Sequence, residues 1–409
     1  MKALVFANSM PRIVATRILS LISSKAFVGP LAPLRLEELP APTLPRDDWL
    51  TLRTELCGLC GSDYKQVFLN GAMNNPMTAL VSFPQVLGHE VVATIESVGP
   101  GVTKRRVGER VVLNPWLSCV PRGISPQCEW CARGDYAQCA NFMHGCLTPG
   151  IHHGNSSMAT GGFATAIPAH ESQCIPVPHN VSSTAAVLAD PFSVSLHAIL
   201  RTPPPAGGTV LAYGCGTLGL CAIAILKALF PSVRVFAVAR FEHQAHLARL
   251  LGADEIMMWR PTATIIHKVA ELTGSEVLKP WYGQPMLNGG VDVVYDSVTS
   301  AESLEVGVRI TRTRGAVVAT GVEIPRKFEW TPLYFKEIHL VGSNAFGIEE
   351  YDGRRQHAME WYFELLTAGK IDITPIITHR YALDDYRDAF LTCFDQGRSG
   401  AVKVLFTFD

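Results

Sequence analysis

Cysteine and histidine residues in the first quarter of the chain are of the types that bind a transition metal. Cys57 and Cys60 form a C-x-x-C pair in LCGLCGSDYK, after the strand-like run WLTLRTE, and His89 follows in PQVLGHE. Such a pair could be a thioredoxin-type redox pair, half of a zinc site, or one working cysteine beside an idle one. By itself the pair leaves these three chemistries open.

A second group of cysteines lies in a segment rich in glycine and proline. Within CVPRGISPQCEWCARGDYAQC, Cys128, Cys131 and Cys139 have C-x2-C-x7-C spacing, and Cys119 lies nine positions upstream of the first of them. Four thiolates satisfy a tetrahedral structural zinc, which ties together loop segments that have no core of their own. We therefore predict a structural zinc in a lobe over residues 119–139; the alternative is a set of reduced thiols.

A glycine-rich turn follows a strand-like run in the second half of the chain. AYGCGTLG contains Gly214, Gly216 and Gly219 in G-x-G-x-x-G spacing, with Thr217 and Leu218 between the last two. The glycines allow a tight turn, the approach of a pyrophosphate and close packing of the helix, whose N-terminus attracts phosphate. Because a strand precedes the turn and a helix and strand follow it, we predict a dinucleotide site.

The residue that follows the next predicted strand bears on which dinucleotide binds. NAD sites usually have Asp or Glu there to hold the ribose hydroxyls, whereas VRVFAVARFEH ends in Ala239 and Arg240. A guanidinium pairs with the 2′-phosphate of NADP, which a carboxylate would repel. We therefore predict NADP rather than NAD, with a solvated surface arginine as the alternative.

The motifs lie in two parts of the chain that are predicted to have different folds. From residue 2 to about 180, short alternating strands are separated by glycine, proline and asparagine turns, which predicts a β-rich domain. After residue 208, strands and helices alternate to about residue 344, which predicts a parallel sheet of the α/β class. Helices near 354–368 and 384–396 then lead to the strand AVKVLFTF, which is suited to rejoin the first sheet.

The motifs together resemble the zinc-containing medium-chain dehydrogenase family, the alcohol and polyol dehydrogenases. The resemblance rests on C-G-S-D at Cys60, G-H-E at His89, the four-cysteine lobe, V-G-x-x-V-x-x-x-x-x-G-x-R-V and the nucleotide turn. It fails at an insertion over roughly residues 8–30 and at a smaller one around NGAMNNPMTALVS. It implies a GroES-like catalytic domain, a Rossmann domain and a return to the catalytic domain, over residues 1–192, 193–344 and 345–409.

The resemblance also implies a catalytic zinc. In the family this zinc takes a cysteine, the histidine of G-H-E and a third residue just before the nucleotide domain. The matching residues here are Cys60, His89 and Asp190, the last in ADPFSVSLHA, where polyol dehydrogenases have glutamate. A carboxylate oxygen is an adequate zinc ligand at a similar distance. The fourth position would take water or substrate.

The resemblance further implies roles for the neighbours of these ligands. Ser62 would accept the hydroxyl proton and carry it outward, while Asp63 and Glu90 would orient the histidine and tune the metal. Cys57 would bind no zinc and take no part in the reaction. Lys65 stands where many alcohol dehydrogenases have a histidine that passes the proton to solvent, so the outer relay differs.

One further departure concerns the cysteine lobe. Common members of the family have the first cysteine of the lobe at the position of Ser125, so Cys119 must replace it through a longer loop. The histidines of GIHHGN, His152 and His153, could reach the active site, although a solvated loop is the expected place for them.

The function implied by the resemblance is hydride transfer between NADP and a secondary alcohol or polyol, with carbonyl reduction as the reverse reaction. One alternative is an NAD-dependent sugar or aminocyclitol dehydrogenase. Two others are a non-enzymatic nucleotide-binding protein on the same scaffold and a thiol-disulfide oxidoreductase that uses Cys57 and Cys60.

The charge and hydropathy of the chain limit the kinds of molecule that it is expected to bind. With 35 basic and 36 acidic residues the chain offers no global attraction for nucleic acid or a membrane. Basic residues interrupt the apolar N-terminal stretch, so no signal peptide is predicted and we expect a cytoplasmic protein. The insertion could form an amphipathic helix over the active site or a surface excursion. The strand IHLVGSN resembles a dimer edge of the family, which implies a homodimer or homotetramer.

Overall fold

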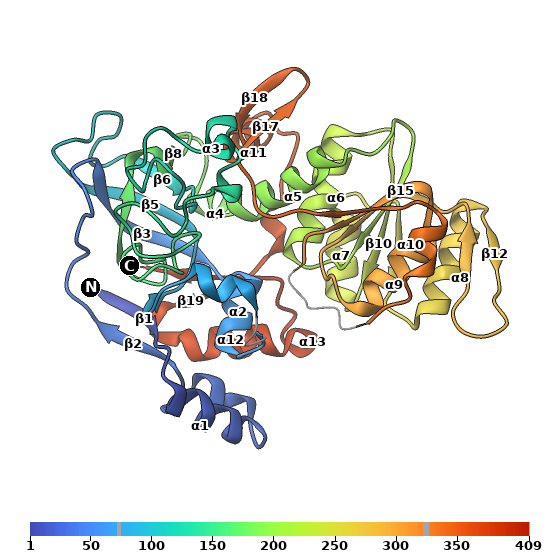
Figure 1. Cartoon of the computed structure of the whole chain (residues 1–409), viewed down its shortest axis with the longest axis horizontal. Coiled ribbons are helices and arrows are strands. Elements are labelled where there is room, and N and C mark those ends of the chain that lie inside the picture. Colours follow the sequence, from blue (N-terminus) through green and yellow to red (C-terminus); the bar gives the residue numbers. More distant parts are fainter. Residues whose placement is uncertain (72–74, 322–326, 409) are drawn as a thin grey trace. The chain divides into compact units, whose positions relative to one another are not determined.

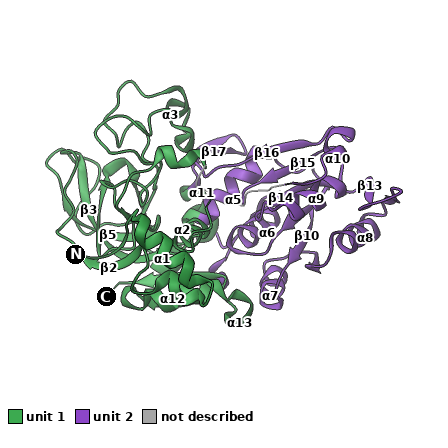
Figure 2. Ribbon diagram, turned by 60° about the horizontal axis from the view of Figure 1, so that its bottom comes forward, with its two compact units in different colours: residues 1–190, 359–367, 377–409 green, residues 191–358, 368–376 purple. Residues whose placement is uncertain are grey.

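The computed structural model describes residues 1–71, 75–321 and 327–408, and the insertion around residue 70 lies partly outside them. The chain divides into two compact units, shown in different colours in Figure 2. Unit 1 comprises residues 1–190, 359–367 and 377–409, and unit 2 comprises residues 191–358 and 368–376. Unit 2 therefore extends past the predicted end at residue 344, and the chain crosses between the units several times.

Unit 1 is built on a mainly antiparallel sheet of seven strands. Its order is β19-β20-β3-β5-β6-β8, with β7 also pairing with β3. β3 alternates buried residues such as Leu50 and Leu52 with the exposed Arg53, because one face packs on the core. The strands are β3 (Trp49–Gly58), β5 (Glu90–Val98), β6 (Arg110–Leu113), β7 (Ala166–His170), β8 (Cys174–Pro176), β19 (Ile377–Ala382) and β20 (Lys403–Thr407).

The C-terminal strand returns to this sheet, which confirms the prediction for AVKVLFTF. β20 pairs antiparallel with the end of β3, so Leu405 lies opposite Gly58 and Phe406 opposite Cys57. The end of β3 is the point from which the chain enters the segment that carries Cys60. Residues that are 347 to 351 positions apart in the sequence therefore line the same corner of unit 1.

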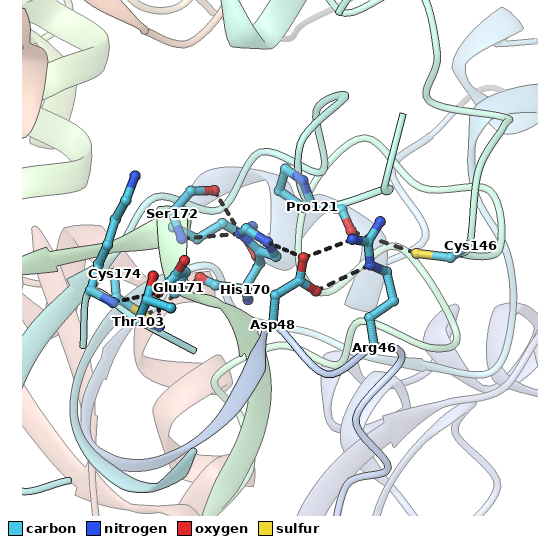
Figure 3. A network of polar contacts seen from close by, with 11 residues as sticks. Arg46, Asp48, Thr103, Pro121, Cys146, His170, Glu171, Ser172 and Cys174 are labelled. Carbon is cyan, nitrogen blue, oxygen red and sulfur yellow. Dashed lines mark hydrogen bonds and ion pairs between the residues drawn. The ribbon is translucent and has the colours of Figure 1, made fainter. Parts of the chain in front are cut away.

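A polar network holds the start of β3 (Figure 3). The Asp48 carboxylate accepts a hydrogen bond from Arg46 at 2.8 Å and lies 3.2 Å from Nε2 of His170, at the end of β7. The backbone N–H of Ser172 donates to Nδ1 of His170 at 3.0 Å, which leaves the ring proton on Nε2, facing Asp48. These bonds hold the start of β3, and Cys60 follows the other end of the same strand.

A smaller sheet of unit 1 carries the N-terminal insertion. β1 (Lys2–Phe6) pairs with β2 (Leu34–Glu38) and β4 (Gln85–Val86). Between β1 and β2 the chain forms α1 (Met10–Ser20) and the short helix η1 (Ser24–Val28) (Figure 1). The insertion thus contains a helix, as one of the two alternatives expected, while a position over the active site stays a prediction.

Unit 2 contains a parallel sheet of six strands in the order β11-β10-β9-β14-β15-β16. This is the strand order of doubly wound dinucleotide-binding domains, with the order reversing beside β9. The strands are β9 (Thr209–Tyr213), β10 (Arg234–Ala239), β11 (Glu255–Met258), β14 (Val291–Asp296), β15 (Thr311–Ala319) and β16 (His339–Gly342). The connecting helices are α6 (Thr217–Leu229), α7 (Glu242–Leu250), α8 (Thr262–Thr273), α9 (Ala301–Ile310) and α10 (Thr331–Phe335). The predicted parallel α/β sheet is confirmed.

The segment after this sheet differs from the prediction. The helix expected near residue 354 begins only at the start of α11 (Ala358–Thr367), because β17 (Ile348–Tyr351) and β18 (Arg354–His357) form a hairpin before it. The hairpin turn is Asp352-Gly353, with φ of +51° and +70°, the conformation of a two-residue turn. This D-G pair was the signal in the sequence for the hairpin. The next predicted helix is α12 (Tyr386–Phe394).

One helical segment among the described residues, 183–201, is long and apolar enough to span a membrane by length and composition, and 72% of it is buried inside the protein. It comprises α4 (Ser183–Ala186) and α5 (Ala189–Arg201). Burial of this kind is typical of a core helix, whose apolar residues pack against other elements rather than against lipid.

Acidification should destabilise unit 2 through His357. Burial lowers the pKa of His357 from 6.5 to about 4. As the pH falls below 6.5 the unfolded chain takes up a proton that the folded chain excludes, so stability present above 6.5 is lost toward pH 4. The loss should approach about 1.4 kcal/mol per pH unit.

Chemical denaturation at several pH values would measure this loss. His357→Gln should flatten the dependence, while His246→Gln, at an exposed position of the same unit, should leave it unchanged. An equal slope in the wild type and the His357 variant would contradict the assignment.

Candidate functional site

The segment that carries Cys60 lies between β3 and the short helix α2 (Gly61–Val67). Gly58 ends β3, and a side chain there would collide with Glu90, because a Cβ would lie 1.9 Å from Oε2 of that residue. Cys60 is the N-cap of α2. The chain thus turns directly from the sheet into a helix, which leaves the Cys60 thiol at the strand end beside the start of β5.

Asp63 joins the two segments that carry the cysteine and the histidine. Its carboxylate accepts hydrogen bonds from the backbone N–H groups of Cys60, at 3.1 Å, and Gly88, at 3.2 Å. Oδ1 also lies 3.8 Å from Nδ1 of His89. Asp63 is buried, so these contacts take place away from water. The 3.8 Å separation is longer than a hydrogen bond, and Nδ1 of His89 has no hydrogen-bond partner, so the role of Asp63 in orienting His89 stays a prediction.

Cys60, His89 and Glu90 form a group in which one ligand atom from each residue lies within 4.8 Å of the others. His89 and Glu90 are buried and Cys60 is half-buried. A thiolate, an imidazole and a carboxylate at such distances are a normal donor set for zinc with one open position. The structure thus brings together two of the three predicted ligands, and Glu90 is the third member of the group.

Asp190, the predicted third ligand, lies in the first turn of α5 but outside that group. Its Oδ2 atom is buried without a hydrogen-bond partner. Burial raises the pKa of Asp190 to about 7, although the neighbouring charges of His89 and Lys403 act to lower it. Asp190 is thus near enough for these charges to act on its carboxyl group but outside the group itself, and its role as a zinc ligand stays a prediction.

Lys403 is a site residue that the motifs did not indicate. Its side chain is 1% exposed, and its ammonium group forms an ion pair with Glu90 and donates a hydrogen bond to the Leu59 carbonyl at 3.2 Å. The signal in the sequence was a lysine inside the apolar strand AVKVLFTF, whose burial requires a partner. The positive charge of Lys403 therefore neutralises the negative charge of Glu90.

The charges around His89 suit a cation. Burial opposes protonation of His89, but the negative charges of Asp63 and Cys60 outweigh it and raise its pKa well above the ordinary value. Asp190 and Glu90 are further acidic groups nearby, and the buried ammonium group of Lys403 offsets part of their negative charge. An excess of buried acids with an unpartnered Asp190 oxygen is the environment that a divalent metal stabilises. The residues present therefore fit a zinc ion.

His152 was expected in a solvated loop, and the structure places it beside His89 instead. Its ring packs against His89, with 4.7 Å between centroids, and against Trp116 at 5.6 Å. Nδ1 donates to the His153 carbonyl at 2.5 Å, which leaves Nε2 as an acceptor. Burial lowers the pKa of His152 to about 3, so the ring is neutral. His153 is fully buried and bonded to the Thr160 carbonyl.

The four cysteines of the lobe lie together, with their Sγ atoms within 4.8 Å of one another. Cys119 reaches the group from the longer loop, and Asn141 donates hydrogen bonds to Sγ of Cys119 at 3.2 Å and of Cys139 at 3.3 Å. Burial opposes ionisation of Cys128, but backbone N–H groups outweigh it and lower its pKa to about 7. Cys131 is the fourth cysteine of the group. Four thiols with N–H donors directed at their sulfur atoms fit a metal bound by thiolates.

The loops of the lobe are held by Arg122, which is 1% exposed. Its guanidinium donates five hydrogen bonds to backbone carbonyls of the segment that spans residues 117–150. A lobe with so little apolar core depends on such cross-links and on a bound metal. Cys57, by contrast, is buried in the core of unit 1, where its thiol lies against Gly88, outside both cysteine-containing groups.

The glycine-rich turn has the geometry that phosphate binding needs. Gly214 follows β9 with a φ of +91°, which favours glycine. A Cβ at Gly219 would lie 1.8 Å from the Gly214 carbonyl, so that glycine lets α6 approach the strand. A Cβ at Gly216, the N-cap of α6, would meet open space. Thr217 and Leu218 begin the helix, whose N-terminus faces this space.

Two further residues border this turn. Arg240 directly follows β10, is exposed, and lies over the Phe241 ring, with its guanidinium carbon 5.3 Å from the centroid. Asp296 ends β14 fully buried, accepts hydrogen bonds from the N–H groups of Val298 and Thr299, and has an Oδ2 atom without a partner. Arg240 is where the prediction placed it; Asp296 was missed because no motif contains it.

The two remaining predicted residues are on α2. Ser62 is exposed in the first turn, next to Cys60 in the sequence. Lys65 is half-buried one turn later. Their spacing of three positions places them on the same side of the helix.

Comparisons with known proteins agree with this architecture. The family model of the alcohol dehydrogenase GroES-like domain matches residues 46–179, and that of the zinc-binding dehydrogenases matches residues 217–362. The first match contains Cys60, His89 and the cysteine lobe. The second begins at Thr217, within the nucleotide turn.

Individual proteins resemble the chain over most of its length. A sorbitol dehydrogenase of Arabidopsis thaliana is 29% identical over 93% of this chain and 94% of its own. A crystallised alcohol dehydrogenase of Escherichia coli CFT073, complexed with NADH, shares the fold at a TM-score of 0.73, with 23% identity and coverage of 100% and 99%.

A zinc-binding dehydrogenase of Sinorhizobium meliloti 1021, bound to NADP, has a TM-score of 0.68, 24% identity and coverage of 92% and 95%. The same fold is thus found with either cofactor. The protein belongs to the zinc-containing medium-chain dehydrogenase family and is an oxidoreductase of the alcohol and polyol dehydrogenase type.

Proposed function

We propose that this protein transfers hydride between a secondary alcohol or polyol and NADP, with carbonyl reduction as the reverse reaction. The observation that carries the proposal is the group of Cys60, His89 and Glu90, with the unpartnered Asp190 oxygen in the same acidic surroundings. Cys60 and His89 would hold zinc, and one of the two carboxylates would complete the protein ligands.

When bound, zinc would supply a Lewis acid that lowers the pKa of the alcohol, and NADP would accept the hydride. The residues of the chain provide the remaining functions. Asp63 holds the Cys60 and His89 segments together, and Lys403 neutralises part of the acidic charge. Ser62 accepts the hydroxyl proton and passes it to water from its exposed position on α2.

The lobe of Cys119, Cys128, Cys131 and Cys139 would hold a second, structural zinc. Its four thiolates leave no open position for substrate, and the Asn141 donors stabilise the thiolate charge. This zinc would contribute to the stability of unit 1 rather than to the reaction.

Turnover measured by nicotinamide absorbance tests the proposed reaction. The zinc-loaded protein should oxidise members of a panel of secondary alcohols and polyols and reduce matching carbonyl compounds. Cys60→Ser should abolish this turnover, whereas Cys57→Ser is the matched control and should retain it. Loss of activity in the Cys57 variant alone would favour thiol-disulfide chemistry, and no turnover of any substrate would refute the dehydrogenase assignment.

The cofactor preference rests on Arg240. Its guanidinium lies at the end of β10, where a 2′-phosphate would be recognised. Replacing Arg240 with Asp should lower the ratio of kcat/KM with NADP to that with NAD by at least about tenfold, because a carboxylate repels the phosphate and accepts from the ribose hydroxyls.

Arg234→Asp provides the control for this measurement. Arg234 is an exposed arginine at the opposite end of the same strand, so its replacement changes the net charge equally. The ratio should stay at the wild-type value in that variant. A wild-type ratio in the Arg240 variant, or a preference of the unaltered protein for NAD, would contradict the proposed preference.

A further inference from the structure

The glycine-rich turn after β9 needs support from the residues around it. Gly214 has a φ of +91°, a conformation that glycine adopts at low cost and can also leave at low cost. The direction of each peptide group in such a turn decides whether an N–H group or a carbonyl oxygen faces a phosphate. A turn that binds pyrophosphate therefore requires contacts that fix its peptide groups before the ligand binds.

The end of β10 holds one side of the turn. The backbone N–H of Gly214 donates a hydrogen bond to the Val238 carbonyl at 3.0 Å. This bond fixes the nitrogen of Gly214 but not its carbonyl group, which belongs to the next peptide bond, the one to Cys215. A second contact is required to fix the direction of that peptide group.

The hydroxyl group of Ser297 provides this second contact. Ser297 directly follows β14, and its Oγ lies 2.9 Å from the carbonyl oxygen of Gly214 and 3.1 Å from that of Tyr213. The backbone N–H of Ser297 also donates to the Tyr213 carbonyl, at 3.1 Å. A Cβ at Gly219 would lie 1.8 Å from the Gly214 carbonyl oxygen and 3.2 Å from Oγ of Ser297. The Gly214 carbonyl thus contacts both the Ser297 hydroxyl and the first turn of α6.

The loop that carries Ser297 is itself held in place. Oδ1 of the buried Asp296 accepts hydrogen bonds from the backbone N–H groups of Val298, at 2.9 Å, and Thr299, at 2.8 Å. Thr299 has a φ of +56°, which is unusual for a β-branched residue. Such a conformation persists only where surrounding contacts impose it, and it is found most often at functional sites. These contacts fix the position of Ser297 beside the turn.

We propose that Ser297 is a positioning residue for the nicotinamide dinucleotide, because its hydroxyl group holds the Gly214 peptide group in the direction that lets the turn accept the pyrophosphate. Without the hydroxyl, that peptide group can rotate, so only a fraction of the molecules has the binding conformation and the apparent affinity falls by that fraction. Ser297 acts through Gly214 and is not a catalytic residue. The inference rests on the dinucleotide binding of the proposed function, but not on which dinucleotide is preferred.

Titration of the full-length, zinc-loaded protein with NADPH and with NADH, followed by nicotinamide fluorescence, tests the proposal. Ser297→Ala should raise the Kd of the dinucleotide that binds more tightly about three- to tenfold, the effect of one lost hydrogen bond. Ser297→Thr keeps a hydroxyl group and should bring the Kd back to within about twofold of the wild-type value.

Ser300→Ala is the matched control. Ser300 belongs to the same loop, but its side chain caps α9 by accepting a hydrogen bond from the Ser303 backbone N–H at 3.1 Å. Loss of this cap should lower the midpoint of thermal unfolding and leave the Kd at the wild-type value.

The outcomes separate this inference from the proposed reaction. Equal Kd values in the wild type and Ser297→Ala would overturn the inference and leave the proposed reaction intact. An equal rise of the Kd in Ser300→Ala would also overturn it, because a general loosening of the loop would then account for the effect. A wild type that binds neither dinucleotide would overturn both.

Discussion

Replacing Lys403 with methionine should lower kcat/KM by at least about a hundredfold and destabilise unit 1 by about 3–5 kcal/mol. The Lys403 ammonium is 1% exposed and pairs with the 2% exposed Glu90 carboxylate. Removing one member of a buried ion pair leaves the other as an uncompensated charge. Since Glu90 belongs to the group with Cys60 and His89, its displacement would also disturb the reaction.

Three variants would separate these effects in steady-state kinetics and chemical denaturation. Lys403→Arg preserves the charge and should retain more activity than the methionine variant. Adding Glu90→Gln to Lys403→Met removes both charges and should recover part of the stability. Lys336→Met is the matched control, because Lys336 is another buried lysine but is held by backbone carbonyls of unit 2. It should lose stability without the same loss of kcat/KM at the site.

The role of Lys403 would be refuted by a folded methionine variant with the kcat/KM of the wild type. The same result would mean that Glu90 tolerates burial near the metal site without a cationic partner.

Replacing Cys119 with serine should reduce bound zinc from two ions to one per subunit. The Cys119 thiol lies within 4.8 Å of the other three and accepts a hydrogen bond from the Cys128 backbone N–H at 3.3 Å. Serine cannot supply the thiolate that closes the zinc shell. Because the lobe has little apolar core, the unfolding midpoint should also fall by more than about 5 °C.

Metal analysis and thermal unfolding would measure both results. Cys146→Ser is the matched control, since Cys146 belongs to the same region, its thiol contacts the Pro121 carbonyl at 3.6 Å, and it lies outside the thiolate group. It should keep two zinc ions and the wild-type midpoint. Two zinc ions in the Cys119 variant would show that another donor completes the lobe.

Short-range motifs allowed much of the site to be predicted. Cys60 and His89 lie within one group, and the lobe cysteines lie together even though Cys119 had to be reached through a longer loop. Gly214 and Gly219 have the backbone conformation and close packing that the glycine pattern indicates. Such features depend on residues that are near in sequence, so spacing alone is informative.

Residues whose roles depend on distant contacts were not predicted. Lys403 reaches Glu90 only because β20 pairs with β3, and the paired residues are 347 to 351 positions apart, which no local pattern reveals. The His152 ring was expected in solvent but packs on His89 through a bridge between its loop and Trp116. The hairpin before α11 was missed although its D-G turn was visible, because the flanking residues were assigned to a helix.

The sequence by itself determined the family, the two kinds of scaffold and the candidate ligands Cys60 and His89, because local periodicity and motif spacing carry that information. Only the tertiary structure decided that Glu90 rather than Asp190 joins these two residues in the group, and that α1 presents its apolar face outward. Both outcomes depend on side-chain reach and on which surfaces other elements cover. These are properties of long-range packing, and a linear pattern does not contain them.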